Sequence, residues 1–241
     1  MSPEPPLLVV EGLVKRFGGF RALDGVTFHL APGEVLGLVG PNGSGKTTCI
    51  NVISGLYPPD GGRVTYQGRA IGGIASHALA RRGINRTFQS PKPFLSLSVR
   101  ENVTVAATYG NAGPAPDLDA LLASLELDTL ADRPAGELNS AQQKTLDLAR
   151  ALATGPRVLL VDELAAGLNP AELGRMADRL RALAGAGMAL LVVEHLMGFI
   201  DKVTDRVVVM NAGREFFEGT LATAIKDPEV IRVFLGGAPH D

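Results

Sequence analysis

The sequence has a single cysteine in 241 residues and no excess of positive charge. One cysteine excludes an internal disulfide framework and fits a reducing compartment. This residue, Cys49, lies in an apolar stretch with helical spacing, so we expect a small, buried and unreactive side chain. The net charge of −2 gives no excess of basic side chains that could bind the phosphates of a nucleic acid. We therefore expect no nucleic-acid binding.

Long hydrophobic runs are absent as well. The most apolar run, residues 188–193, is far shorter than the ~20 residues that a membrane-spanning helix needs. The N-terminal letters MSPEPPLLVVEG lack the basic start and the long apolar core of a secretory signal. We expect a cytoplasmic chain, which can still lie on the inner face of the plasma membrane by docking to a partner.

What the sequence does contain is an alternation of short apolar runs with helical patterns. Strand-like runs occupy residues 35–39, 157–161, 189–193 and 206–210. The second and third are almost purely apolar, as is typical of parallel strands that are buried on both faces. Because helical segments separate these runs, the chain is predicted to have an α/β fold with a mostly parallel sheet.

One stretch breaks this alternation. Residues 91–150 contain no strand pattern, carry a Gly/Pro-rich break at 109–117 and otherwise have helical spacing. We predict one domain over residues 1–241, with a helical lobe inserted into its core. The lobe covers about 91–150, and the core covers about 1–90 and 151–241.

Two further stretches are bounded by turn residues. The letters PPDGGRVTYQG at residues 58–68 predict a short strand between turns. The letters GTLATAIKDPEVIRVFLGG at residues 219–237 predict two short helices that separate at Asp227 and Pro228, because proline cannot continue the preceding helix.

The letters GPNGSGKTT at residues 40–48 match the phosphate-loop pattern G-x-x-x-x-G-K-[ST], after a predicted strand and before a helix. Glycines let the backbone N–H groups point at phosphates, and the helix N-terminus adds a favourable field. We expect Lys46 to reach the β- and γ-phosphates and Thr47 to bind Mg²⁺. A plain glycine-rich turn is the alternative, which this context disfavours. The predicted nucleotide contacts are Asn42, Gly43, Ser44, Gly45, Lys46, Thr47 and Thr48.

An acidic pair, Asp162 and Glu163, follows the apolar run at 157–161. In phosphate-loop proteins an aspartate at such a strand end holds Mg²⁺. An adjacent glutamate can polarise the water that attacks the γ-phosphate. Acidic residues also end strands simply because they meet solvent, but the phosphate loop upstream favours the functional interpretation. A nucleotide and Mg²⁺ are therefore the predicted ligands.

Together with several other stretches, these motifs resemble the ATP-binding subunits of ABC transporters over nearly the whole chain. The resemblance implies a phosphate-loop NTPase core with an N-terminal antiparallel β portion and an inserted α-helical lobe. It implies that Phe17 in VKRFGG stacks on adenine, although a core aromatic is the alternative. It implies that Gln89 in RTFQ senses Mg²⁺ and the transport partner, and that His195 in VVEHLM is a catalytic switch at the γ-phosphate rather than a structural histidine.

Within that family the chain is most similar to the ATPases of branched-chain amino acid importers, in stretches such as GINRTFQSPKPFLSLSVRENV and ELAAGLNPAEL. Importers of urea or short amides share these stretches. The resemblance implies a head-to-tail dimer with an identical or different ATPase subunit, integral membrane permease subunits as partners, and a periplasmic solute-binding protein that acts indirectly. Residues 90–105 would contact the permease.

The segment 138–142, LNSAQ, departs from the family pattern Leu-Ser-x-Gly-Gln, which binds the ATP held by the other subunit. Asn139 stands in place of serine and Ala141 in place of glycine, while Ser140 and Gln142 complete the predicted contact. Asparagine caps a helix as well as serine does, and alanine keeps the backbone N–H. We therefore expect a weakened contact rather than a lost one.

Other functions remain open from the sequence. A regulatory module that binds nucleotide without turnover is favoured by Ala141 and by Leu164, which stands where the family usually has proline, and is opposed by Glu163 and His195. An ABC-type ATPase acting on DNA or ribosomes is disfavoured by the near-neutral charge and the lack of long coiled-coil insertions. A lipid or polysaccharide exporter ATPase is the third alternative.

Overall fold

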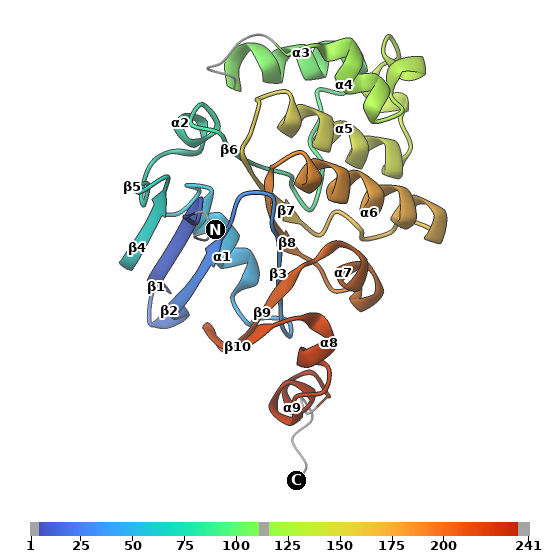
Figure 1. Ribbon diagram of the computed structural model, residues 1–241. Coiled ribbons are helices and arrows are strands. Elements are labelled where there is room, and N and C mark those ends of the chain that lie inside the picture. The colour runs from blue at the N-terminus through green and yellow to red at the C-terminus, as the bar shows by residue number, and fades with distance from the viewer. Residues whose placement is uncertain (1–4, 111–115, 236–241) are drawn as a thin grey trace.

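The computed structural model describes residues 5–110 and 116–235, which form two β-sheets surrounded by helices (Figure 1). The smaller sheet is antiparallel, with the order β2-β1-β4-β5. Its strands are β1 (Leu8–Phe17), β2 (Phe20–Leu30), β4 (Gly61–Tyr66) and β5 (Arg69–Ala70). The antiparallel N-terminal portion and the strand at 58–68 are thus confirmed.

The larger sheet has the order β10-β9-β3-β8-β7-β6, and all of its neighbouring pairs except β10 with β9 are parallel. Its strands are β3 (Val35–Val39), β6 (Ile84–Arg86), β7 (Val158–Asp162), β8 (Ala189–Val193), β9 (Arg206–Asn211) and β10 (Arg214–Gly219). Every residue of β3, β7 and β8 is buried. The apolar runs therefore form central strands covered on both faces, as predicted.

Helix α1 (Lys46–Ile53) lies between the two sheets (Figure 1). Its side chains, including Cys49 and Ile50, share one hydrophobic cluster with residues of β1, β2 and one face of the larger sheet. Cys49 is fully buried, and burial raises the pKa of its thiol to about 12, as expected for an unreactive side chain.

The second hydrophobic cluster covers the other face of the larger sheet and joins it to the helices that follow β6. Between β6 and β7, the described residues contain helices and 3₁₀ turns but no strand. The break predicted at 109–117 falls mainly on 111–115, outside the described residues. The helices are α2 (Ser76–Ala80), α3 (Val99–Gly110), α4 (Leu118–Ser124), α5 (Ser140–Leu152), α6 (Pro170–Gly185), α7 (Met197–Val203), α8 (Leu221–Ala224) and α9 (Pro228–Leu235).

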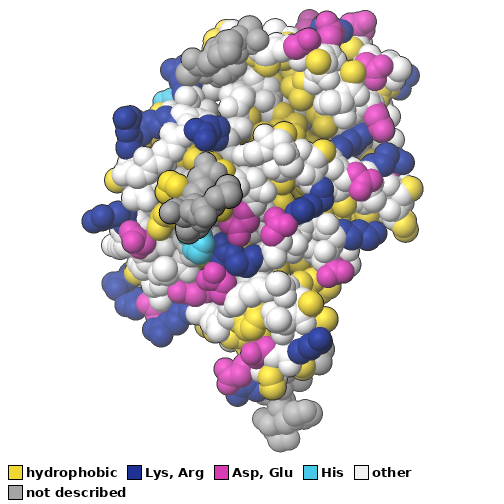
Figure 2. Space-filling model, viewed as in Figure 1, with side chains coloured by type: hydrophobic (Ala, Val, Ile, Leu, Met, Phe, Trp, Pro, Cys, Tyr) yellow, Lys and Arg dark blue, Asp and Glu magenta, His cyan; other side chains and the backbone are white. Residues whose placement is uncertain are grey.

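Helices α8 and α9 confirm the predicted separation at Pro228, although the last predicted residues, 236–237, lie outside the described part. None of the helices in the described ranges is long and apolar enough to cross a membrane. On the face in Figure 2, basic and acidic side chains are interspersed rather than gathered by sign.

The register of the sheet brings distant parts of the chain to one edge. Leu38 of β3 and Asp162 of β7 both pair with Val193, the last residue of β8. Because these strands are parallel, the segments that follow their carboxyl ends emerge side by side. These segments are the phosphate loop, Glu163 and His195.

Candidate functional site

The phosphate loop connects β3 to α1, and two of its glycines are required by the backbone. Gly40 has φ 148°, and a Cβ there would lie 2.2 Å from the carbonyl oxygen of Met210. Gly45 has φ 107°, and its Cβ would lie 2.7 Å from the carbonyl oxygen of Ala22. Any side chain would therefore clash with the chain that wraps around the loop.

Lys46, the first residue of α1, folds back over this loop. Its Nζ donates hydrogen bonds to the carbonyl oxygens of Gly40 at 2.8 Å and Pro41 at 2.9 Å. The side chain is buried, and burial lowers its pKa, while the Glu163 and Asp162 carboxylates oppose that change. The ammonium thus lies at the loop, close to both acidic residues.

Asp162 ends β7 in a buried ion pair. Its Oδ2 lies 3.0 Å from Nη2 of Arg86, the last residue of β6, and both side chains are almost fully buried. Nη1 of Arg86 also donates to Asn51 Oδ1 at 2.6 Å. Burial raises the pKa of Asp162, and the Arg86 charge opposes the rise. The sequence did not predict a role for this arginine, because the adjacency of β6 and β7 appears only in the folded structure.

The second oxygen of Asp162 differs from the first, which Arg86 holds. Within the described part of the chain, Asp162 Oδ1 is buried and makes no hydrogen bond. An unpaired carboxylate oxygen in a protein interior is costly, and Mg²⁺ prefers oxygen ligands of this kind. Together with the exposed Thr47 at the start of α1, this oxygen fits a magnesium site beside the phosphate loop.

Glu163 is held between two other predicted site residues. Its Oε1 lies 2.6 Å from His195 Nε2, and its Oε2 accepts a hydrogen bond from Gln89 Nε2. The backbone of Glu163 is left-handed, with φ 48°, a conformation that non-glycine residues rarely adopt. Such a conformation persists only where surrounding contacts enforce it, and it is typical of functional sites.

Glu163, His195 and the phosphate loop border a cavity of about 240 Å³. Phe20 lines it and is 65% exposed, whereas Phe17 does not line it. Phe17 is 43% exposed and packs edge-on against Tyr57, so it is not a core aromatic. The two phenylalanines are paired across the β1–β2 turn. The lining residues are Phe20, Ala22, Asn42, Gly43, Gly45, Lys46, Thr47, Thr48, Glu163 and His195.

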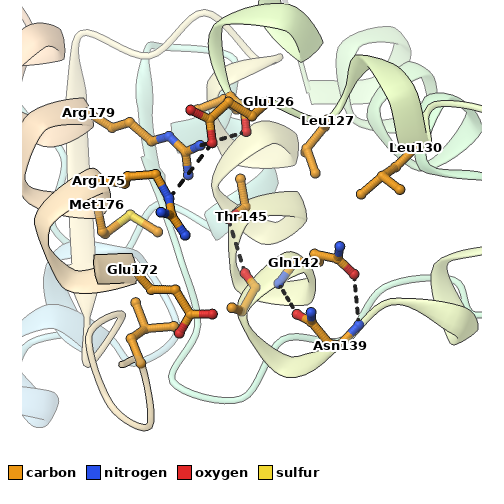
Figure 3. Close-up of a pocket in the computed structure, with 13 residues that line it drawn as sticks. Glu126, Leu127, Leu130, Asn139, Gln142, Thr145, Glu172, Arg175, Met176 and Arg179 are labelled. Carbon is orange, nitrogen blue, oxygen red and sulfur yellow. Dashed lines mark hydrogen bonds and ion pairs between the residues drawn. The ribbon is translucent and has the colours of Figure 1, made fainter. Parts of the chain in front are cut away.

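The LNSAQ segment begins α5 and borders a different cavity, of about 200 Å³ (Figure 3). Asn139 Oδ1 accepts from the N–H of Gln142 at 2.9 Å, and Gln142 Oε1 accepts from the N–H of Asn139 at 3.0 Å. This capping box confirms that asparagine serves as the helix cap. Ala141 lies within the helix without positive φ, so alanine adds no backbone strain.

The same cavity contains side chains from α6 and from the turn after α4 (Figure 3). Arg179 Nη2 lies 2.8 Å from Glu126 Oε2, and Arg175 Nε lies 3.9 Å from the same oxygen. The structure therefore brings together Lys46, Asp162, Glu163, Gln89 and His195, while it leaves the LNSAQ segment at a separate site.

The sequence is similar to proteins of one known family. The family model described as ABC transporter matches residues 23–166. The chain is 37% identical to the high-affinity branched-chain amino acid transport ATP-binding protein BraF of Pseudomonas aeruginosa, over 97% of this chain and 99% of that protein. It is 35% identical to LivG of Escherichia coli, which carries the same description, over 97% of this chain and 99% of that protein.

The fold matches a solved structure equally well. The ADP conformation of MJ1267, an ATP-binding cassette of an ABC transporter, superimposes with a TM-score of 0.88 at 33% identity. The match covers 97% of this chain and 100% of that one. Family, fold and phosphate loop lead to one conclusion. The chain belongs to the ABC transporter family and is one of its ATP-binding subunits, an ATPase.

Proposed function

We propose that this chain hydrolyses ATP to drive an importer of branched-chain or related amino acids. The observation that carries the proposal is the Glu163 carboxylate, which His195 and Gln89 hold beside the phosphate loop. The names of BraF and LivG support the substrate class. Urea or short-amide import remains the nearest alternative, because the solute is selected outside this subunit.

ATP would bind with its phosphates on the backbone N–H groups of the loop and with Lys46 at the β- and γ-phosphates. Thr47 and Asp162 would hold Mg²⁺, with Gln89 as a further ligand. When bound, that ion neutralises charge on the phosphate oxygens. Phe17 and Phe20 offer exposed aromatic rings at the β1–β2 turn for the adenine.

Glu163 would accept a proton from the attacking water, while His195 would contact the γ-phosphate. Both oxygens of the glutamate are engaged by Gln89 and His195. Each carboxylate oxygen keeps a second lone pair, so a water could bind Glu163 while Gln89 and His195 hold the orientation of the carboxylate. A partner or nucleotide that moves Gln89 or His195 would reorient the carboxylate and thereby change the rate of hydrolysis.

A second ATPase subunit would complete the site, and the LNSAQ segment would contact the ATP of that subunit. The first turn of α5 offers backbone N–H groups and a positive dipole end to a phosphate. Asn139 uses its side-chain oxygen for the cap and keeps its amide group for such a contact. Ala141 adds a methyl group where the family pattern has glycine. This methyl group would crowd the phosphate and weaken the contact with the ATP of the second subunit.

The permease would dock beside Gln89, which places the subunit on the inner face of the membrane. Exposed aromatic side chains gather there, including Phe88, Phe94 and Tyr109 around a cavity of about 300 Å³. Clustered exposed apolar side chains are typical of interaction sites. A periplasmic solute-binding protein would act through the permease.

The test is the ATPase rate of the wild-type chain against Glu163→Gln, with Mg²⁺ present. We expect the variant to lose about 10²-fold or more of the rate, because the amide cannot accept the proton. Glu229→Gln makes the same chemical change on the exposed surface of α9 and should keep the wild-type rate. Equal rates for wild type and Glu163→Gln would refute the proposed role.

A further inference from the structure

The loop that follows Glu163 is held by a buried lysine from another part of the chain. Lys144, on α5, donates from Nζ to the carbonyl oxygens of Glu163 at 3.3 Å and Leu164 at 3.0 Å, and also to that of Ala166. The lysine is only 6% exposed. One charged group therefore binds three backbone oxygens of a four-residue loop.

An acidic group holds the same loop from another side. Glu194 Oε1 accepts a hydrogen bond from the backbone N–H of Ala165 at 2.6 Å, and its side chain is buried. Burial lowers the pKa of Lys144, and the Glu194 and Glu163 carboxylates oppose this change, so the two charges support each other. Lys144 thus binds carbonyl oxygens of the loop, and Glu194 binds the backbone N–H of Ala165.

The loop depends on these contacts because its own sequence does little to fix it. Glu163 is left-handed, with φ 48°, and Leu164 does not restrict its own φ as a proline would. Leu164 places its side chain in the hydrophobic core, which anchors one point of the loop. Lys144 supplies a hydrogen bond to the buried carbonyl oxygen of Leu164 and further hydrogen bonds to those of Glu163 and Ala166.

Helix α5 also reaches the other side of the Glu163 carboxylate. Asp147 lies three residues after Lys144, on the same side of the helix. Its Oδ2 accepts from the N–H of Phe88 at 2.8 Å, and the next residue, Gln89, donates to Glu163. Helix α5, which begins with LNSAQ, is therefore connected to Glu163 in two ways. Lys144 binds the backbone carbonyl of Glu163, and Asp147 holds the segment from which Gln89 reaches the Glu163 carboxylate.

We infer that Lys144 is a positioning residue for hydrolysis, which sets the backbone of residues 163–166 so that the Glu163 carboxylate lies between His195 and Gln89. Because it belongs to α5, it also couples the LNSAQ contact with the ATP of the second subunit to the glutamate of its own chain. This inference rests on the proposed function of Glu163 and of the LNSAQ segment.

The test compares steady-state ATP hydrolysis by the wild-type chain, Lys144→Met and Lys144→Arg. Methionine keeps much of the side-chain length but removes every donor, so we expect kcat to fall about tenfold or more. The KM for ATP should stay within about twofold, because the phosphate loop is untouched. Arginine keeps the charge and donors and should restore part of the rate. Lys202→Met, at an exposed position on α7, is the matched control.

A second background separates positioning from general support of the fold. In Glu163→Gln, adding Lys144→Met should not lower the residual rate further, because Lys144 acts through the carboxylate. A purely structural lysine would reduce the rate in both backgrounds and raise the KM for ATP, which would overturn the inference. Should Lys144→Met fail to fold, Lys144→Gln serves instead, and a kcat within about twofold of wild type overturns the inference.

The two proposals fail differently. If the wild-type rate does not depend on Glu163, the proposed function is wrong and the inference fails with it. If hydrolysis depends on Glu163 but Lys144→Met keeps its kcat, only the role of Lys144 is wrong.

Discussion

Replacing Arg86 with methionine is expected to destabilise the protein strongly, and the structure allows the size to be worked out. The substitution removes the ion pair with Asp162 and the hydrogen bonds to Asn51 and Ser54. Asp162 Oδ1 already makes no hydrogen bond within the described residues, so the carboxylate would be left buried without a partner. Breaking a buried pair in this way costs about 3–5 kcal/mol.

That loss is a large part of the roughly 5–15 kcal/mol by which a domain is stable. It should appear in urea unfolding, monitored by circular dichroism without Mg²⁺, as a lower midpoint at an unchanged slope. Adding Asp162→Asn should recover much of the loss, because the unpaired charge is then gone. Arg232→Met, which breaks an exposed pair with Glu229, should change little.

Two outcomes would refute this reasoning. One is a loss below about 1 kcal/mol for Arg86→Met, the range of an exposed pair. The other is a double variant that is as unstable as the single one, since the cost would then come from lost packing of the arginine side chain rather than from the carboxylate.

Three further predictions concern other parts of the chain. Phe20→Ala should weaken ATP binding, measured by titration calorimetry, by about 1–3 kcal/mol if the ring stacks on the base, and Phe17→Ala should do so as well. An unchanged affinity for both would exclude the β1–β2 turn from the adenine site. Restoring the family pattern with Asn139→Ser and Ala141→Gly should raise the ATPase rate of the assembled transporter, and an unchanged rate would show that the two substitutions do not attenuate the site. Burial raises the pKa of Asp147 above its value in the unfolded chain, so the folded state binds more protons and the stability from this residue falls as pH rises from about 4 through the folded pKa. Urea unfolding from pH 4 to pH 7 should therefore show a smaller loss of stability for Asp147→Asn than for wild type, and parallel curves would contradict the assignment.

The features that follow from local sequence were predictable. The strands β3, β7 and β8 were recognisable because each is a short apolar run whose whole length is buried. The phosphate loop was recognisable because its glycines and Lys46 lie within nine residues of each other. The capping box of Asn139 and Gln142 was partly foreseen, since a helix cap depends on residues three positions apart.

The features that depend on tertiary placement could not be predicted. Arg86 and Asp162 meet because two parallel strands are adjacent, and nothing in their local sequence states that pairing. Lys144 reaches the loop after Glu163 from a helix about twenty positions upstream, and only the packing of α5 shows it. Phe20 was missed because an aromatic beside a glycine turn has no periodicity to place it.

The contact between Lys46 and its own loop has a consequence for nucleotide exchange. The ammonium already has carbonyl partners at Gly40 and Pro41, so an arriving phosphate competes with the backbone of the protein. The contribution of Lys46 to nucleotide affinity is then the difference between its hydrogen bonds to the phosphate and its hydrogen bonds to the loop carbonyls. After product release the lysine can return to the carbonyls, so no buried charge is left unsatisfied at either end of the cycle. Such a site binds nucleotide with a lower net affinity than one in which the ammonium has no partner before the phosphate arrives.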